Sequence, residues 1–365
     1  AKGLKMGQLG NSVFEILQDE NEFVSFKQVY VMFISHWLKH LAESIPELEE
    51  ALKKGLETGD FEFTSIIGQL IIYWNFYGGE PIPKILQRGE LLSKQIAPLN
   101  QIMQIKRIDL FRQSALCLVD GVEDFEFLSG EIFDERKIDF SDEPAFSLYF
   151  HNLYAQKKVL SLIFNQNEAA WKFCCLTKLH LIPVKGSITE MLFYYYENLC
   201  ITPIFPSRSS SEQKSLLKIC KKNIKLIGGL VKHSEVNFQH RHEFMKAEYQ
   251  ALKGNFDKAI KSFTYAIRYA RIHKYIQDEA LIWERAGTYF NAQQQPEAAQ
   301  FYLTNAYKSY EKWGATAKLA QMKEVYSGFI SSEEIGLNTN ILVLDKILKT
   351  INLILSEMKF ENILT

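Results

Sequence analysis

A helical periodicity that runs along nearly the whole chain constrains its fold more than any other feature. Apolar residues recur at positions i, i+3, i+4 and i+7, a spacing that places them on one face of an α-helix. No convincing run alternates polar and apolar residues as a β-strand would. The pattern predicts an all-α fold. Helices are expected at 3–18, 21–38, 46–58, 61–77, 82–96, 101–119, 142–165, 167–180, 185–199, 211–232, 236–253, 255–273, 275–293, 295–312, 315–329 and 340–360.

The breaks between these helices carry residues that end or start helices. Gly59, Gly79, Gly254 and Gly314 stand where helices are expected to stop, and Ser209 is a candidate N-cap. Because the connections are short, successive helices are expected to form antiparallel hairpins. The predicted architecture is a right-handed superhelical stack of such hairpins, a tetratricopeptide-like α-solenoid.

Two neighbouring helix pairs in the last third of the chain share a pattern of small and aromatic residues. Small residues let two helices approach closely, and an aromatic ring fills the groove beside them. The interval between matching positions is longer than that of ordinary tetratricopeptide repeats. The pairs, 39 residues apart, are Ala247/Ala286, Ala259/Ala298 and Phe263/Tyr302.

Two segments interrupt the helical rhythm and suggest how the chain is organised. Residues 120–140 combine eight acidic and two basic residues with phenylalanines. They favour an ordered loop held by its aromatic rings, with a contact loop as the alternative. Residues 201–211 (ITPIFPSRSSS) are a predicted linker. We therefore expect an N-terminal helical-repeat subdomain at 1–200, tetratricopeptide-like repeats at 212–330, and a signalling or coiled-coil helix at 331–365 that leads to a downstream domain.

The charge of the chain is balanced overall but unevenly distributed. The 365 residues carry a formal net charge of −1, so the chain as a whole is not expected to bind nucleic acid. Residues 1–140 contain 14 basic and 22 acidic residues, whereas residues 205–274 contain 15 and 5. The basic segment is most simply a set of solvated helix faces. The alternative is a docking face for an acidic partner, such as the acidic first part of the chain itself.

Composition also narrows the class of protein and its compartment. With 47% hydrophobic residues the chain has material for a sizeable core, and no apolar run is long enough for a membrane span, so no membrane partner is expected. The odd number of cysteines and the lack of a C-x-x-C pair indicate reduced thiols, most of them in the core, and a cytoplasmic location. The five are Cys117, Cys174, Cys175, Cys200 and Cys220.

No arrangement of residues in the sequence calls for catalytic, metal or cofactor chemistry. His36 and His40 lie one helical turn apart, as zinc ligands do, but the apolar neighbours of His36 favour core or interface histidines. Asp278 and Glu279 are interpreted as ordinary helix-surface residues. The lysines of 214–232 are interpreted as a solvated face, since that helix lacks the aromatic and arginine groups of a nucleic-acid reader. We expect no catalytic residue, no metal and no cofactor, and hence a protein that is not an enzyme.

Short motifs spread over roughly residues 5–330 resemble one known family. The motifs are NFQHRH at 237–242, AE at 247–248, DEAL at 278–281 with Glu284, Y-x2-WGA-x-AK at 310–318, SHW at 35–37, GLE-x-GD at 55–60, GEP at 79–81 and LSG at 128–130. Their order and spacing resemble the tetratricopeptide-like helical region of multidomain bacterial-type signalling proteins. In that family an AAA-type ATPase, sometimes preceded by a Ser/Thr kinase, comes before this region, and a GAF domain and often a histidine kinase follow it.

The resemblance implies that this chain is one part of a longer polypeptide. The family's catalytic motifs do not occur here: there is no G-x-x-x-x-G-K-[S/T] phosphate loop and no kinase H-R-D or D-F-G set. The region is therefore expected to regulate rather than to catalyse.

The last segment contains a short heptad pattern. Its apolar positions are spaced alternately by three and four residues over about two and a half heptads. Either this seam forms a homodimeric coiled coil that continues toward the next domain, or it packs on the preceding repeat. The seam residues are Ile341, Leu344, Leu348, Ile351, Leu355 and Met358.

These expectations together describe a non-catalytic protein-interaction and regulatory module of a larger signal-transduction protein. It would hold a protein segment, or neighbouring domains of the parent chain, and pass that state to an output domain. A free-standing peptide-binding scaffold or secreted effector is the second hypothesis, and an unrecognised enzyme is the third. The candidate protein-binding residues come from the first helix of each recognisable pair: Arg241, Lys246, Tyr249, Trp283 and Tyr289.

Overall fold

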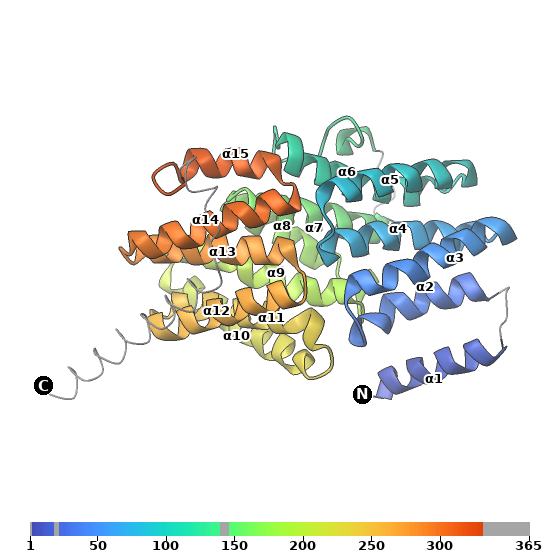
Figure 1. Ribbon diagram of the computed structural model, residues 1–365, viewed down its shortest axis with the longest axis horizontal. Coiled ribbons are helices and arrows are strands. Elements are labelled where there is room, and N and C mark those ends of the chain that lie inside the picture. Colours follow the sequence, from blue (N-terminus) through green and yellow to red (C-terminus); the bar gives the residue numbers. More distant parts are fainter. Residues whose placement is uncertain (1, 18–21, 139–145, 331–365) are drawn as a thin grey trace, which may run out of the picture.

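The computed structural model describes residues 2–17, 22–138 and 146–330, and these residues are almost entirely helical (Figure 1). Within these ranges there is no β-strand, and the only β-type pairing is an isolated bridge between Ser129 and Asp134. The prediction of an all-α fold is confirmed. The expected helix at 340–360, with the heptad seam, lies outside the described residues.

Fifteen α-helices and several short 3-10 turns make up the described chain. The α-helices are α1 (Lys2–Leu17), α2 (Phe23–Phe33), α3 (Ile45–Thr58), α4 (Phe61–Gly78), α5 (Ile82–Ile96), α6 (Ile102–Asp120), α7 (Ser147–Ile163), α8 (Asn167–Leu179), α9 (Ile188–Ile204), α10 (Ser210–Val231), α11 (Glu235–Leu252), α12 (Phe256–Ile272), α13 (Ile276–Ala292), α14 (Pro296–Trp313) and α15 (Thr316–Val325). The 3-10 turns are η1 (Ser35–Trp37), η2 (Leu41–Ser44), η3 (Ala97–Leu99), η4 (Glu135–Lys137), η6 (Ile182–Val184) and η7 (Phe205–Ser207).

Most helix boundaries lie within a few residues of those predicted, because the periodicity and the terminating residues agree. Three helix ends differ by four residues or more, among them that of α15, which ends at Val325 and not at 329. Helix α2 ends at Phe33, since the chain then tightens into η1. Helix α9 continues to Ile204, with Pro203 in its last turn, so part of the expected 201–211 linker is helical. At Ser209 the predicted N-cap is present as a capping box with Glu212.

The helices of the last third of the chain end in a regular series of turns. Gly254, Lys274, Gln294 and Gly314 all have positive φ (70°, 61°, 58° and 91°) and are spaced 20 residues apart. The backbone N–H of the residue after each of them donates to the carbonyl five residues earlier, as in Schellman caps. The helix pairs therefore repeat every 40 residues. The interval of 39 predicted from side-chain types is one residue too short, because similar residues stand in adjacent positions, such as Ala298 and the buried Ala299.

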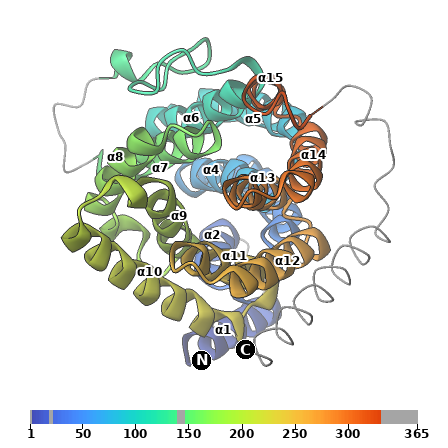
Figure 2. The same ribbon diagram turned by 90° about the vertical axis from the view of Figure 1, so that its left-hand side faces the viewer.

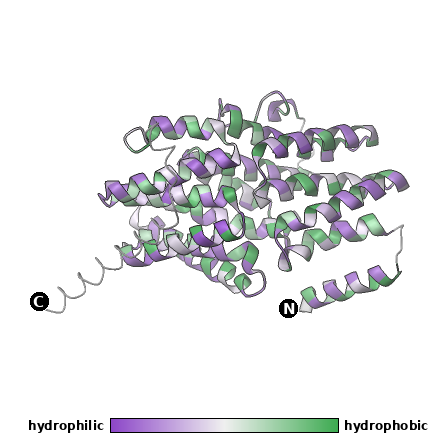
Figure 3. Ribbon diagram, in the orientation of Figure 1, coloured by the Kyte–Doolittle hydropathy of each residue, from purple (hydrophilic) through white to green (hydrophobic). Residues whose placement is uncertain are grey.

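The main hydrophobic core draws its buried residues from Val24 to Ile330, and no residue of α1 is among them. Consecutive helices pack on one another, notably α3 on α4, α5 on α6, α7 on α8, α11 on α12 and α13 on α14. Figure 2 shows α4 and α13 near the middle of the molecule with other helices around them, and both are buried along most of their length. Hydrophobic and hydrophilic residues alternate along most of the outer helices (Figure 3), as amphipathic helices require.

The acidic segment after α6 is held by its aromatic rings, as predicted, and also by one amide. Phe133 is buried, Phe125 packs on the core, and Phe127 is 44% exposed. The Gln113 side-chain oxygen accepts hydrogen bonds from the backbone N–H groups of residues 132 and 133. Part of the segment, including Phe140, lies outside the described residues.

A buried carboxylate joins the last helices to the middle of the chain. Glu284 of α13 forms an ion pair of 2.7 Å with Lys318 of α15, and both side chains are almost fully buried. Asn165, Tyr310 and Tyr326 also donate to this carboxylate. Burial raises the pKa of Glu284, but Lys318 and the other donors outweigh it and hold the pKa below its usual value. A charge that is this well satisfied fixes the relative positions of four elements.

The cysteines follow the prediction with one exception. Cys117, Cys174, Cys200 and Cys220 are buried free thiols, whereas Cys175 is exposed.

None of the helices in the described ranges combines the length and the apolar character that crossing a membrane requires.

Candidate functional site

The α4–α5 turn packs against the α12–α13 connection and the end of α14. Gly79 has a φ of 85°, and a Cβ atom there would lie 2.6 Å from the Gln277 side-chain oxygen and 2.9 Å from the Lys274 carbonyl oxygen. Only glycine fits a left-handed conformation at such close approach. The turn therefore touches the α12–α13 connection directly.

Hydrogen bonds fix this turn from two sides. The Gln277 side-chain nitrogen, in the first turn of α13, donates to the Tyr77 carbonyl oxygen at the end of α4 (2.9 Å). The Trp313 indole, at the end of α14, donates to the Glu80 carbonyl oxygen (3.1 Å). The C-terminus of α4 thus meets the N-terminus of α13, a favourable pairing of opposite helix-dipole ends.

The contact between the α4–α5 turn and the α12–α13 connection is called the junction below. A buried ionic cluster centred on Asp278 lies next to it. Its carboxylate contacts the His240 imidazole Nε2 and the Arg241 guanidinium, each at 2.9 Å, and accepts a hydrogen bond of 3.1 Å from the Tyr195 hydroxyl. Burial raises the pKa of Asp278, but Arg241 and the two hydrogen-bond donors outweigh it and keep the pKa below its ordinary value. Burial, reinforced by Arg241, lowers the pKa of His240 to about 4, so this imidazole is neutral at pH 7.

The interpretation of Asp278 and Glu279 as ordinary surface residues is wrong. Asp278 is 1% exposed and Glu279 is 6% exposed, because both lie in the first turn of α13 where it enters the junction. The pattern alone does not show that Asp278 has a buried partner, because an acid in the first turn of a helix is equally favoured at the surface by the positive end of the helix dipole. Here that partner is Arg241, whose guanidinium carbon lies 4.5 Å from the centre of the Tyr275 ring.

The cluster also ties in the segment between α2 and α3. The Asn237 amide donates to the His36 and Lys39 carbonyl oxygens (2.7 and 2.8 Å), and its oxygen accepts a hydrogen bond from the Tyr275 hydroxyl. The His40 ring packs on Tyr275 at 4.3 Å. Residues from the N-terminal and C-terminal parts of the chain thus form one buried unit.

An open basic groove lies over this junction. Its volume is about 510 Å³, and its walls come from the α4–α5 turn, the α12–α13 turn and α14. Four cationic side chains line it, together with the neutral polar groups of Asn305 and Ser309. The cationic residues of this basic groove are Arg271, Lys274, Lys308 and Lys312.

Two of the four cations of the groove, Lys274 and Lys312, form no ion pair within the described ranges. Glu279 is the one carboxylate among its lining residues, and it forms a 2.8 Å ion pair with Arg271. The Trp283 indole donates to the same carboxylate (3.2 Å) and thereby orients it. Lys274 and Lys312 are exposed. Such a concentration of like charge in a concave surface attracts anionic groups of a partner.

The acidic first part of the chain does not occupy the basic segment in this structure. Within the described ranges, no ion pair joins an acidic residue of 1–140 to a basic residue of 205–274. Glu126 and Glu135 pair with Lys172 and Lys157 instead.

The five predicted protein-binding residues are not brought together in the groove. Arg241 and Trp283 are buried, the first in the Asp278 cluster and the second beneath the groove. Lys246 pairs with Glu243 on its own helix. Tyr249 packs against a small separate cluster around Cys220, and Tyr289 packs on Phe256 and Phe263. Sequence reasoning missed the groove lysines, although the pair Lys308 and Lys312, one helical turn apart, was a usable signal.

The two histidines are in the core, as predicted, and the lysines of the basic helix are at the surface. His36 and His40 are buried, and burial lowers the pKa of each to about 3, so neither carries a charge at pH 7. No group of three potential metal ligands is found within the described ranges. The lysines of α10 are exposed, which agrees with a solvated face. They are Lys214, Lys218, Lys221, Lys222 and Lys225.

Comparison of the sequence with models of known protein families gives no match, and comparison with curated protein sequences gives none either. The resemblance to the helical region of signalling proteins therefore stays a prediction. Several motifs that carry it nonetheless meet at one place: residues 79–81, 237–241, 278–284 and 313–314 all contribute to the junction or to the ion pair beside it.

Proposed function

We propose that this chain is a non-catalytic protein-interaction and regulatory module of a larger signal-transduction protein. Its docking site is the basic groove, and its partner is an acidic protein segment. In this proposal the helix pairs form a tetratricopeptide-like superhelical stack of antiparallel hairpins, for which the 20-residue spacing of the left-handed turn residues is the support.

The observation that carries the proposal is the chemistry of the groove. Arg271, Lys274, Lys308 and Lys312 converge on an open concave surface that has a single, already paired carboxylate. Asn305 and Ser309 supply neutral polar groups between the charges. A segment rich in carboxylates offers the complementary charge.

The position of the groove supports a regulatory role. The groove includes Gly79 and Pro81 of the N-terminal part together with residues of α12, α13 and α14. A segment that contacts both parts would stabilise the junction between them by mass action. Binding would thereby change the stability of the contact between the two parts of the module.

The proposal is tested by the binding of a fluorescein-labelled polyglutamate peptide, measured by fluorescence anisotropy at low and high salt. The variant Lys274→Glu/Lys312→Glu reverses two exposed groove charges. We expect this variant to bind at least about tenfold more weakly, and added salt to weaken binding to the wild type.

The matched control is Lys221→Glu/Lys225→Glu, which makes the same change in net charge on the exposed face of α10. It should leave the affinity close to that of the wild type. If both variants lose the same affinity, the peptide responds to net charge alone, and the proposal of a groove site is wrong.

A further inference from the structure

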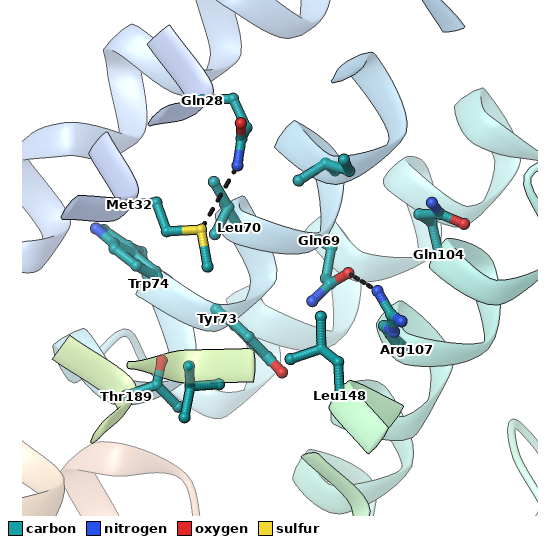
Figure 4. A pocket seen from close by; sticks show the side chains of 12 residues that line it. Gln28, Met32, Gln69, Leu70, Tyr73, Trp74, Gln104, Arg107, Leu148 and Thr189 are labelled. Carbon is teal, nitrogen blue, oxygen red and sulfur yellow. Dashed lines mark hydrogen bonds between the residues drawn. The ribbon is translucent and has the colours of Figure 1, made fainter. Parts of the chain in front are cut away.

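A partly enclosed cavity lies in the N-terminal part of the molecule, away from the basic groove. Its volume is about 170 Å³, and it is bounded by α2, α4, α6, the start of α7, and the segment that leads from η6 into α9 (Figure 4). Engineered cavities of about 150 Å³ with apolar walls hold benzene. This cavity therefore has room for a ligand with one ring or a short branched chain.

The walls of the cavity are mostly apolar. No aspartate or glutamate is among its lining residues. Five aliphatic side chains and the ring of Trp74 supply apolar surface, and neutral polar side chains, among them Gln28 and Thr189, stand between them. The aliphatic members are Met32, Ile66, Leu70, Leu148 and Val184.

One cationic side chain, Arg107 of α6, lines this apolar cavity. Its Nη1 donates a hydrogen bond of 3.2 Å to the side-chain oxygen of Gln69, as Figure 4 shows. No carboxylate in the described ranges forms an ion pair with it, and its buried Nε has no hydrogen-bond partner. Burial lowers the pKa of Arg107, yet a guanidinium keeps its charge in proteins. The cavity therefore has at its wall a partly buried positive charge that forms no ion pair within the described ranges.

A second buried polar group stands beside it. Tyr73 of α4 is 5% exposed, and its hydroxyl makes no hydrogen bond of normal geometry, although the amides of Gln69 and Asn152 lie near it. Burial raises the pKa of this hydroxyl, so it stays protonated and can donate. Unsatisfied buried donors are costly and are uncommon in folded proteins.

We propose that this cavity binds a small monocarboxylate with an apolar body. The carboxylate accepts hydrogen bonds from the Arg107 guanidinium and from the Tyr73 hydroxyl, and the body of the ligand packs on Leu70, Leu148 and Val184. A carboxylate fits because it supplies both the missing charge and the missing acceptors. A neutral apolar ligand would leave the guanidinium without a counterion, and a small hydrophilic anion would leave the apolar walls unfilled.

The test compares benzoate, benzamide and acetate as probes of the full chain by isothermal titration calorimetry. Benzoate carries both features, benzamide lacks the charge, and acetate lacks the ring. We expect benzoate to bind at least about tenfold more tightly than either of the others, since benzamide lacks the charge-assisted hydrogen bond and acetate lacks the apolar contacts. Equal affinities for benzoate and benzamide, equal affinities for benzoate and acetate, or no benzoate binding up to about 10 mM would overturn the proposal.

Variants locate the site. Arg107→Met should remove the preference for benzoate over benzamide, whereas Lys106→Met, one position earlier on the same helix, should keep it. If Arg107→Met retains the preference, the proposal is wrong. The comparison of the three probes on the wild type decides the question even if a variant fails to fold.

Discussion

Replacement of Asp278 by asparagine is expected to destabilise the chain strongly. The carboxylate of Asp278 is 1% exposed and is the only carboxylate that forms an ion pair with Arg241 within the described ranges. Asparagine keeps the size of the side chain and an oxygen that can accept from Tyr195, but it leaves the Arg241 charge buried without a counterion. Removal of one member of a buried ion pair typically costs about 3–5 kcal/mol.

The lower end of that range applies here, because Arg241 keeps other acceptors. Its Nη1 donates to the Asn237 carbonyl oxygen at 2.7 Å, and its guanidinium lies over the Tyr275 ring. We therefore expect Asp278→Asn to lower the free energy of unfolding by about 3 kcal/mol. The double variant Asp278→Asn/Arg241→Met should lose less than the sum of the two single variants, since neither charge then remains.

The assay is urea-induced unfolding of the full chain followed by tryptophan fluorescence. The control is Glu90→Gln, which removes the acid of an exposed pair with Lys94 and should leave the unfolding midpoint close to that of the wild type. The reasoning is refuted if Asp278→Asn unfolds at the wild-type midpoint. It is also refuted if the effects of the Asp278 and Arg241 substitutions simply add.

Three further predictions concern the turns and the buried histidines. Gly79→Ala should lower the free energy of unfolding by at least about 1–2 kcal/mol, because the new Cβ would meet the Lys274 carbonyl oxygen. It should also weaken the binding of polyglutamate, and a wild-type affinity would contradict the assigned turn. Gln294→Gly should raise that free energy by up to about 1 kcal/mol, since glycine adopts the observed φ of 58° without strain, and a lower urea midpoint would contradict this. His36 and His40 have folded-state pKa values of about 3, so the unfolded chain binds more protons below pH 6.5. Urea titrations should therefore show stability that is fully present above pH 6.5 and falls as the pH drops, by up to about 1.4 kcal/mol per pH unit for each histidine; equal stability at pH 7.5 and 5 would contradict this.

The sequence predicted the helices well because local signals determine them. Apolar periodicity indicated each helix, and Gly59, Gly79, Gly254 and Gly314 ended helices where expected. Lys274 and Gln294 take the same left-handed conformation without being glycine. The 20-residue spacing of these turns therefore could not be recognised from the positions of the glycines.

The junction could not be predicted, and the groove only in the pair Lys308 and Lys312, because both depend on contacts between distant segments. Asp278 is separated by 37 residues from Arg241 and by 83 from Tyr195, and nothing nearby in sequence marks it as buried. The groove combines residues near 79, 271 and 308, so its cationic side chains come close together only when the chain folds. The burial of Arg241 and Trp283 has the same origin: in sequence they have the character of binding residues, but tertiary packing gives them internal partners.

The most direct test of the central claim is photo-crosslinking of a polyglutamate peptide that carries a benzophenone group, followed by mass spectrometry of the adducts. If the basic groove is the docking site, the adducts should concentrate in the segments around 271–279 and 305–312. The Lys274→Glu/Lys312→Glu variant should lose them. Adducts that concentrate on α10 instead, or that persist unchanged in this variant, would contradict the proposal that an acidic segment binds in the groove.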